Sequence, residues 1–250
     1  GNIQRFPYVV ANYGGGAFLA FYFLFVFVLG IPLVLAEFSL GRYFKTNPYK
    51  VFRQSLPKGK LWALVSLLPI LIPFFIFVYY LVISAWTVSF TVLNFAGSVS
   101  SLDEITTNAG LSFSSSLLLL GVLSFVVYKG VNKGIETLSK VLMPLLFVLL
   151  IALAVNSLCL EKGFEGLKFF LTPDWSKVDA KLLIFAAGQA FFSLCVGEGV
   201  LLTYGSYVSK KENLISSALS MVFFDTFVAF LSGLIIFPAL FAFGFDLNQD

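Results

Sequence analysis

The stretch Ser193-Leu194-Cys195-Val196-Gly197-Glu198-Gly199 lies in the middle of an apolar run over residues 182–207. Two glycines that flank a carboxylate weaken a helix here, because glycine loses much backbone entropy and a charge is costly in an apolar setting. Unwound backbone would expose carbonyl oxygens that hold a cation, and the N-terminus of the next half-helix would favour a carboxylate. A glycine-rich face that packs on a neighbouring helix is the structural alternative.

The rest of the chain is equally apolar. Hydrophobic residues make up 59% of the 250 residues and charged residues only 12%, which is too apolar for a water-soluble domain. Only helices and closed barrels satisfy every backbone group in lipid, and the alternation of barrel strands is absent, so the sequence predicts an all-α polytopic membrane protein. We expect a half-length helix over 1–12 and then six spans, at 17–41, 61–96, 111–128, 138–160, 182–207 and 214–244.

Lysine and arginine collect in alternate loops. Six of them, from Arg42 to Lys60, follow the first full span; three lie within 129–140, and Lys210 and Lys211 precede the last span. Because basic residues mark cytoplasmic loops, these loops are predicted to be cytoplasmic and the acidic loops between them external. The net charge of +3 therefore reflects membrane topology, and no concentrated basic surface supports a nucleic-acid partner.

The two ends lack the features of natural termini, since the chain begins at Gly1 without methionine and stops in a loop at Asp250. We therefore expect residues 1–250 to be an incomplete, single transmembrane domain. Cys159 and Cys195 have no metal-binding or redox spacing, which argues against zinc and a disulfide. No Asn-x-Ser/Thr acceptor occurs in the external loops, which favours a prokaryotic protein of the cell (inner) membrane.

Several longer motifs are distributed along the whole chain. They are Gly1-Asn2-Ile3-Gln4-Arg5-Phe6-Pro7-Tyr8, Asn12-Tyr13-Gly14-Gly15-Gly16-Ala17-Phe18, Gly30-Ile31-Pro32 with Glu37-Phe38-Ser39-Leu40-Gly41-Arg42, Tyr79-Tyr80 with Ser84-Ala85-Trp86, Lys133-Gly134-Ile135-Glu136, Met143-Pro144, and Gly188-Gln189-Ala190-Phe191-Phe192-Ser193-Leu194 through Tyr204-Gly205-Ser206-Tyr207. Together they resemble the neurotransmitter:sodium symporter family, in particular its bacterial leucine-transporter-like members. The resemblance implies the N-terminal half of that fold, segments 1b to 7, with inverted repeats and broken helices 1 and 6 around a central site.

The resemblance implies a sodium site. Asn2, Ser193 and Asp225 match three positions that supply oxygens to the first sodium ion in the family, and amide, hydroxyl and carboxylate oxygens suit a hard cation. Family members that need chloride commonly have asparagine where Asp225 stands, so a fixed negative charge implies chloride independence. Hydrogen bonding between helices is the alternative role for Asn2 and Ser193, and proton coupling is the alternative for Asp225.

A substrate site and an outer gate are implied in the same way. Tyr80 matches the tyrosine that binds the substrate carboxylate, and Ile76 lies four residues earlier on the same helical face. Phe192 corresponds to an aromatic lid, although packing is the usual role of an aromatic among 31 phenylalanines. Arg5 corresponds to a gate residue that pairs with an acid on segment ten, outside this chain; snorkelling to the interface is its alternative. The implied substrate-binding set is Gly1, Ile76, Tyr80, Phe192, Ser193, Cys195 and Glu198.

Two acids have separate roles. Glu37 matches a buried carboxylate that accepts hydrogen bonds from the free amides of segment six, so with Gly197 and Gly199 it is expected to support the helix break. Glu198 departs from the family, whose residue there is usually apolar. It has three possible roles: to face a polar or cationic substrate, to take up a proton, or to bond backbone amides in the break.

The sequence thus predicts a sodium-coupled secondary symporter that imports an amino acid or related small amine by alternating access. Sodium ions are the only expected cofactor. An enzyme is not expected, because the chain has no histidine and no nucleophile beside a base. A non-transporting receptor and an ion channel on the same scaffold are the alternatives, although the isolated polar positions do not form the continuous polar pore that a channel needs.

Overall fold

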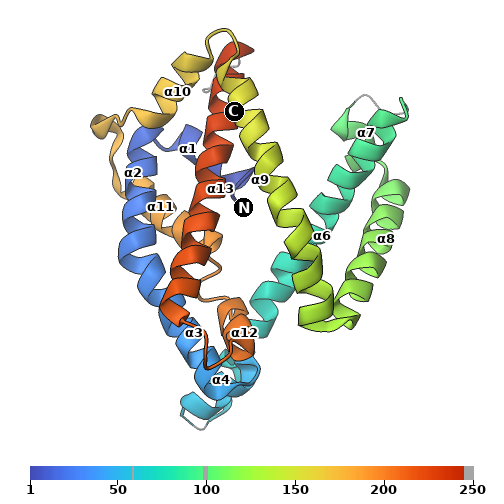
Figure 1. The fold of residues 1–250 in the computed structure, drawn as a ribbon, viewed down its shortest axis with the longest axis vertical. Coiled ribbons are helices and arrows are strands. Elements are labelled where there is room, and N and C mark those ends of the chain that lie inside the picture. Colours follow the sequence, from blue (N-terminus) through green and yellow to red (C-terminus); the bar gives the residue numbers. More distant parts are fainter. Residues whose placement is uncertain (58, 98–100, 245–250) are drawn as a thin grey trace. The chain divides into compact units, whose positions relative to one another are not determined.

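The computed structural model describes residues 1–57, 59–97 and 101–244, and helices dominate it (Figure 1). In this described part, five helical stretches are long and apolar enough to cross a membrane, which confirms the predicted all-α, polytopic class. The predicted span over 182–207 is divided into two helices. The five stretches are Gly16–Phe44, Leu61–Phe95, Ala109–Tyr128, Lys133–Leu158 and Leu214–Ala242.

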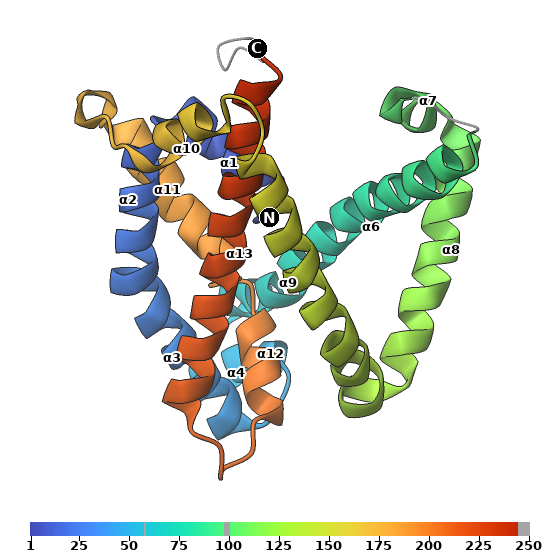
Figure 2. The same ribbon diagram turned by 45° about the horizontal axis from the view of Figure 1, so that its top comes forward.

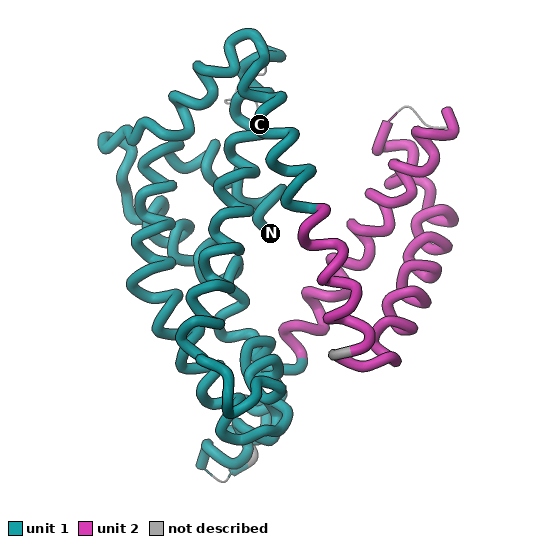
Figure 3. The backbone as a smooth tube through the Cα atoms, in the orientation of Figure 1, with its two compact units in different colours: residues 1–70, 146–250 teal, residues 71–145 magenta. Residues whose placement is uncertain are grey.

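The described chain forms two compact units, residues 1–70 with 146–250, and residues 71–145 (Figure 3). The helices α6 and α9 pass from one unit into the other. The first unit holds α1 (Arg5–Asn12), α2 (Gly16–Phe25), the π-helix η1 (Val26–Gly30), α3 (Ile31–Phe44), α4 (Pro48–Ser55), α5 (Lys60–Val65), α10 (Gly163–Leu171), the 3-10 turn η3 (Trp175–Lys177), α11 (Ala180–Ser193), α12 (Val200–Tyr207) and α13 (Leu214–Ala242), with the ends of α6 and α9.

The second unit consists of most of α6 (Leu68–Phe95), α7 (Leu102–Thr106), α8 (Ala109–Tyr128), the π-helix η2 (Val131–Glu136) and the start of α9 (Thr137–Leu158). The indole nitrogen of Trp86 donates to the Ser112 hydroxyl at 2.9 Å, which ties α6 to α8. Pro73 and Pro144 lie inside α6 and α9.

Pro32 explains the irregular turn in the middle of the first long span. A proline has no N–H to donate to the preceding turn, so the helix must adjust before it. The adjustment is η1, in which the amide of Ile31 reaches back five residues to the Val26 carbonyl. Gly30 ends this turn against α11's end, where a Cβ would lie only 2.5 Å from the Leu194 Cδ1 atom.

Small residues let α3 and α12 pack backbone to backbone. A Cβ on Gly41 would lie 2.2 Å from the Leu202 carbonyl oxygen, and one on Gly205 would lie 2.7 Å from that of Phe38. Close approach through glycines is a usual packing mode of membrane helices, because burial of apolar surface gives no advantage within lipid. In the same unit α11 packs on α2, and α13 contacts α3 towards its start and α10 towards its end (Figures 1 and 2).

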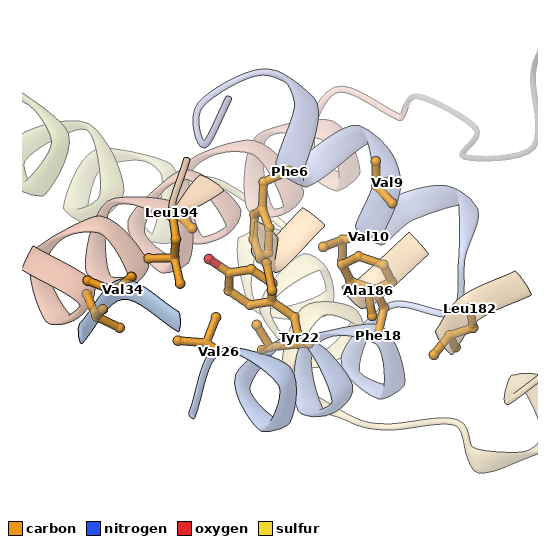
Figure 4. Packing of buried hydrophobic residues seen from close by; sticks show 14 of the residues in the cluster. Phe6, Val9, Val10, Phe18, Tyr22, Val26, Val34, Leu182, Ala186 and Leu194 are labelled. Atoms are coloured by element: carbon orange, nitrogen blue, oxygen red, sulfur yellow. The ribbon is translucent and has the colours of Figure 1, made fainter. Parts of the chain in front are cut away.

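A cluster of aromatic rings fixes α1 in this unit. Phe6, Phe18, Tyr22 and Phe170 are all fully buried. The Phe6 ring lies 5.0 Å from the Tyr22 ring, and 6.5 Å from that of Phe170 in an edge-on arrangement. Figure 4 shows Phe6 and Tyr22 side by side, with the buried Leu194 close to them. The cluster thereby holds the start of the chain close to the end of α11.

A glycine turn follows the opening helix α1. Gly14 and Gly15 have φ of 95° and 59°, and a Cβ on Gly16 would lie 2.6 Å from the Thr172 carbonyl. This part of the chain therefore needs glycine for backbone conformation and for close approach. The sequence did not predict the short helices α4 and α10, which lie in segments expected to be loops.

Candidate functional site

The break inside the predicted span 182–207 lies where the sequence placed it. Helix α11 ends at Ser193, α12 begins at Val200, and residues 194–199 follow no regular helix. Cys195, Gly197 and Gly199 have φ of 54°, 84° and 80°, a conformation that costs a cysteine more than a glycine. Gly199 also has no room for a side chain, since a Cβ there would lie 2.5 Å from the Pro69 Cβ.

Glu37 of α3 contacts the unwound segment directly. Its Oε1 accepts a hydrogen bond of 2.7 Å from the backbone amide of Gly197. A cavity of about 250 Å³ borders Glu37, Gly197 and Gly199. The amide belongs to a stretch without helical partners, so the carboxylate satisfies a donor that the break leaves free.

The side chains of Asn2, Ser193 and Asp225 contact one another, although Ser193 lies 191 residues after Asn2 and 32 residues before Asp225. The side-chain nitrogen Nδ2 of Asn2 donates to the Asp225 Oδ1 at 2.9 Å and to the Asp225 backbone carbonyl at 3.0 Å. The Ser193 hydroxyl lies 2.6 Å from the Asn2 Oδ1 and within hydrogen-bond distance of the second Asp225 oxygen. One hydroxyl proton cannot serve both acceptors fully, so three oxygens converge with a deficit of donors. Such a donor set suits a hard monovalent cation.

Further polar groups that the sequence reading missed surround this cluster. The Tyr22 hydroxyl lies beside the side chains of Ser193 and Thr226 and close to Asp225. Gln189 precedes Ser193 by one turn of α11 and is fully buried, and neither atom of its amide has a hydrogen-bond partner within the described ranges. A glutamine inside an apolar span, one turn before a candidate sodium ligand, is a signal by which the sequence could have identified Gln189 as part of the polar cluster.

Arg5 and Phe192 also meet. The Arg5 guanidinium lies over the Phe192 ring, 4.3 Å from its centre, which is a favourable cation–π geometry. Beside them, the rings of Tyr13 and Phe185 stack at 4.1 Å. A cavity of about 540 Å³ is lined by Arg5, Tyr8, Val9, Asn12, Tyr13 and Phe185. The two residues expected to form a gate are thus in contact at the edge of a cavity.

The comparisons with known proteins agree with this arrangement. The family model of the sodium:neurotransmitter symporter family matches residues 1–103 and 94–249. The chain belongs to this family. It is 38% identical, over all of its length, to an uncharacterised sodium-dependent transporter of Bacillus subtilis, and 30% identical over 96% of its length to the sodium-dependent serotonin transporter of Drosophila melanogaster. It covers 57% and 45% of those two proteins.

A solved structure shows the same fold. The crystal structure of MhsT in complex with L-phenylalanine superposes with a TM-score of 0.90 at 39% identity, over 100% of this chain and 58% of MhsT. The chain thus spans about half the length of the relatives that it matches. The likeness confirms the expected transporter fold with broken helices in its N-terminal half.

Glu198 lies within the helix break of the family fold. It follows Gly197 in the break, is partly exposed, and lies beside the Cys195 side chain. The Gly197 amide, one of the donors that the break exposes, bonds to Glu37 instead. The Gly197 amide is thus occupied by Glu37, and the three roles of Glu198 stay predictions.

Ile76 and Tyr80 lie one turn apart on α6, in the second compact unit. Their spacing puts them on one face of that helix, as predicted. Their contact with the substrate stays a prediction. The Gly1 carbonyl accepts hydrogen bonds from the amides of Arg5 and Phe6 at 3.0 and 3.1 Å, which shapes the turn that carries Asn2.

Proposed function

We propose that this chain forms the N-terminal half of a sodium-coupled symporter that imports an amino acid or a related small amine across the cell membrane. Sodium binds at Asn2, Ser193 and Asp225, and the substrate binds beside it at the breaks of the first and sixth segments. Alternation between outward and inward states moves both across the bilayer, and nothing is chemically converted. Residues 1–250 belong to a single transmembrane transporter domain.

The observation that carries this proposal is the meeting of Asn2, Ser193 and Asp225. These three oxygen-bearing side chains come from the chain start, the end of α11 and the middle of α13. Polar side chains within membrane spans are rare and costly, so three that converge beside an unwound helix mark an ion path rather than ordinary packing. Membership of a sodium symporter family makes sodium the matching cation.

Chloride is not required, because the anion is part of the chain. The Ser193 hydroxyl lies within hydrogen-bond distance of Asp225, and the Tyr22 hydroxyl lies beside Ser193. Without a carboxylate at position 225, hydroxyl donors next to a bound cation would attract an anion from solution. In this chain the Asp225 carboxylate supplies the negative charge.

The substrate is a molecule with an ammonium group and, for Tyr80 to hold it, a carboxylate. Glu198, in place of the usual apolar residue, favours a polar or positively charged side chain over a plain aliphatic one. A carboxylate in a dry pocket bears a desolvation cost that an aliphatic group cannot offset but a cation or hydrogen-bond donor can. The bound L-phenylalanine of MhsT supports an amino acid as the substrate class.

The decisive experiment is uptake by the full-length protein in sealed proteoliposomes. An inward sodium gradient should drive saturable accumulation of a labelled amino acid, and replacing sodium by choline should abolish it. Accumulation above the external concentration distinguishes a symporter from a channel, and any accumulation distinguishes it from a receptor. If no amino acid or amine from a broad panel shows sodium-dependent uptake or binding, the proposal is wrong.

A further inference from the structure

Ser232 is a buried serine on α13, two helical turns after Asp225. Its exposed fraction is 0%. Its hydroxyl oxygen lies 2.6 Å from the Asn2 carbonyl oxygen and 2.7 Å from that of Ala229. A spacing of seven residues puts Asp225 and Ser232 on the same face of a helix. Both side chains therefore reach Asn2 from a single helix, one at its amide group and the other at its backbone.

The Asn2 carbonyl needs a side-chain donor because of its position in the opening turn. An amide four residues ahead would normally serve it, but that amide belongs to Phe6 and bonds to the Gly1 carbonyl at 3.1 Å. Because the bond from Phe6 to Gly1 spans five residues, the next bond of this kind would join the amide of residue 7 to the Asn2 carbonyl. That residue is Pro7, which has no N–H. A carbonyl without a partner inside a membrane protein is costly, so the Ser232 hydroxyl fills a defined gap.

The contact fixes the orientation of a proposed sodium ligand. The Asn2 side-chain nitrogen is held by Asp225 at 2.9 and 3.0 Å, which turns the Asn2 Oδ1 towards the Ser193 hydroxyl at 2.6 Å. This geometry is maintained only while the backbone of Asn2 keeps its position along the axis of α13. The hydrogen bond from the Ser232 hydroxyl to the Asn2 carbonyl fixes that position, although Ser232 is not one of the three proposed sodium ligands.

We propose that Ser232 is a positioning residue for the sodium site, acting through the backbone of Asn2. The proposal rests on the proposed function, since the sodium site is part of it. Removal of the hydroxyl should let the opening turn shift and weaken sodium binding more than it weakens the binding of substrate at saturating sodium.

The test is a sodium titration of uptake by the full-length protein with Ser232→Ala, Ser232→Thr and Ser157→Ala. Ser157 is a matched control, because it is also buried and also donates to a carbonyl of α13, that of Ile235 at 2.5 Å, but it does not contact Asn2. Ser232→Ala should raise the sodium concentration for half-maximal uptake about tenfold, as expected for one buried hydrogen bond. Ser232→Thr, which keeps the hydroxyl, should restore most of the affinity, and Ser157→Ala should leave it unchanged.

A double variant tests whether the effect runs through Asn2. If it does, Asn2→Ala with Ser232→Ala should need no more sodium than Asn2→Ala alone, because coupled residues are not additive. If Ser232→Ala does not fold, Ser232→Cys keeps a weak donor of similar size and should give an intermediate shift.

The outcomes separate the two proposals. Absence of sodium dependence in the unmutated protein overturns the symporter assignment. A sodium-dependent protein in which Ser232→Ala leaves the sodium requirement unchanged, or in which Ser157→Ala raises it equally, overturns the role of Ser232 alone.

Discussion

Asp225→Asn is the sharpest test of the charge at the proposed sodium site. The substitution keeps the size of the side chain and an oxygen that accepts the Asn2 amide, at 2.9 Å in the native chain. It removes the negative charge and replaces the acceptor of the Ser193 hydroxyl with an amide group. A hydrogen bond to a charged group contributes about 1.5–3 kcal/mol, so the sodium concentration for half-maximal uptake should rise about 10- to 100-fold.

The assay is sodium-driven uptake into proteoliposomes in chloride and in gluconate media. The unmutated protein should transport equally in both. Asp225→Asn should transport poorly in gluconate and recover part of its sodium affinity in chloride, because an anion can take the place of the lost carboxylate. Asp103→Asn, which makes the same change at an exposed residue of α7, is the control and should behave as the unmutated protein.

Two results would refute the reasoning. If the unmutated protein loses transport in gluconate, its carboxylate does not replace an anion. If Asp225→Asn keeps its sodium affinity in gluconate, Asp225 does not act at the ion site, and its contacts with Asn2 and Ser193 serve helix packing.

Four further substitutions probe the remaining groups. Asn2→Ala and Ser193→Ala should each weaken sodium-dependent substrate binding about tenfold or more with the protein still folded, because each removes one oxygen from the ion; a sodium titration in which both match the native protein would contradict the site. Tyr80→Phe should lower the affinity for an amino acid more than for an amine without a carboxylate, and competition binding with both ligands checks this; equal losses would exclude the hydroxyl as the carboxylate ligand. Glu198→Leu should shift preference from lysine or glutamine towards leucine in a competition assay, whereas an unaltered rank order would leave Glu198 with a structural role.

The fold could be predicted because apolar length and loop charge are local signals. The spans, the break after Ser193 and the turn at Gly14-Gly15 are all legible in short stretches of sequence. One local signal was passed over. Asn47 followed by Pro48 is a typical helix start, and the Asn47 side chain accepts the Lys50 amide at 2.9 Å at the start of α4.

The site was less accessible to local reasoning, because its members are far apart in sequence. The grouping of Asn2, Ser193 and Asp225 came from the family resemblance, and no spacing rule relates positions 2, 193 and 225. Ser232 was missed for a related reason. Serines in membrane helices commonly bond to their own helix, as Ser232 also does through Ala229, so only the position of the Asn2 carbonyl sets it apart.

The charges around the helix break suggest how the two cargoes cooperate. Glu37 contacts the Gly197 amide, Glu198 follows Gly197 in the chain, and Asp225 contacts the Ser193 hydroxyl at the end of α11, so three carboxylates lie close to the break within the bilayer. Repulsion among them is unfavourable at this depth, and each cation that arrives reduces it. A sodium ion beside Asp225 and a substrate ammonium group beside the break would each lower the repulsion among the three carboxylates. Binding of one cation therefore changes the free energy of binding of the other. Because coupling free energy is reciprocal, sodium should raise substrate affinity by the same factor by which substrate raises sodium affinity. Paired titrations of binding, one of each ligand at several fixed levels of the other, measure this factor, and a factor of one would show that the carboxylates do not couple the two ligands.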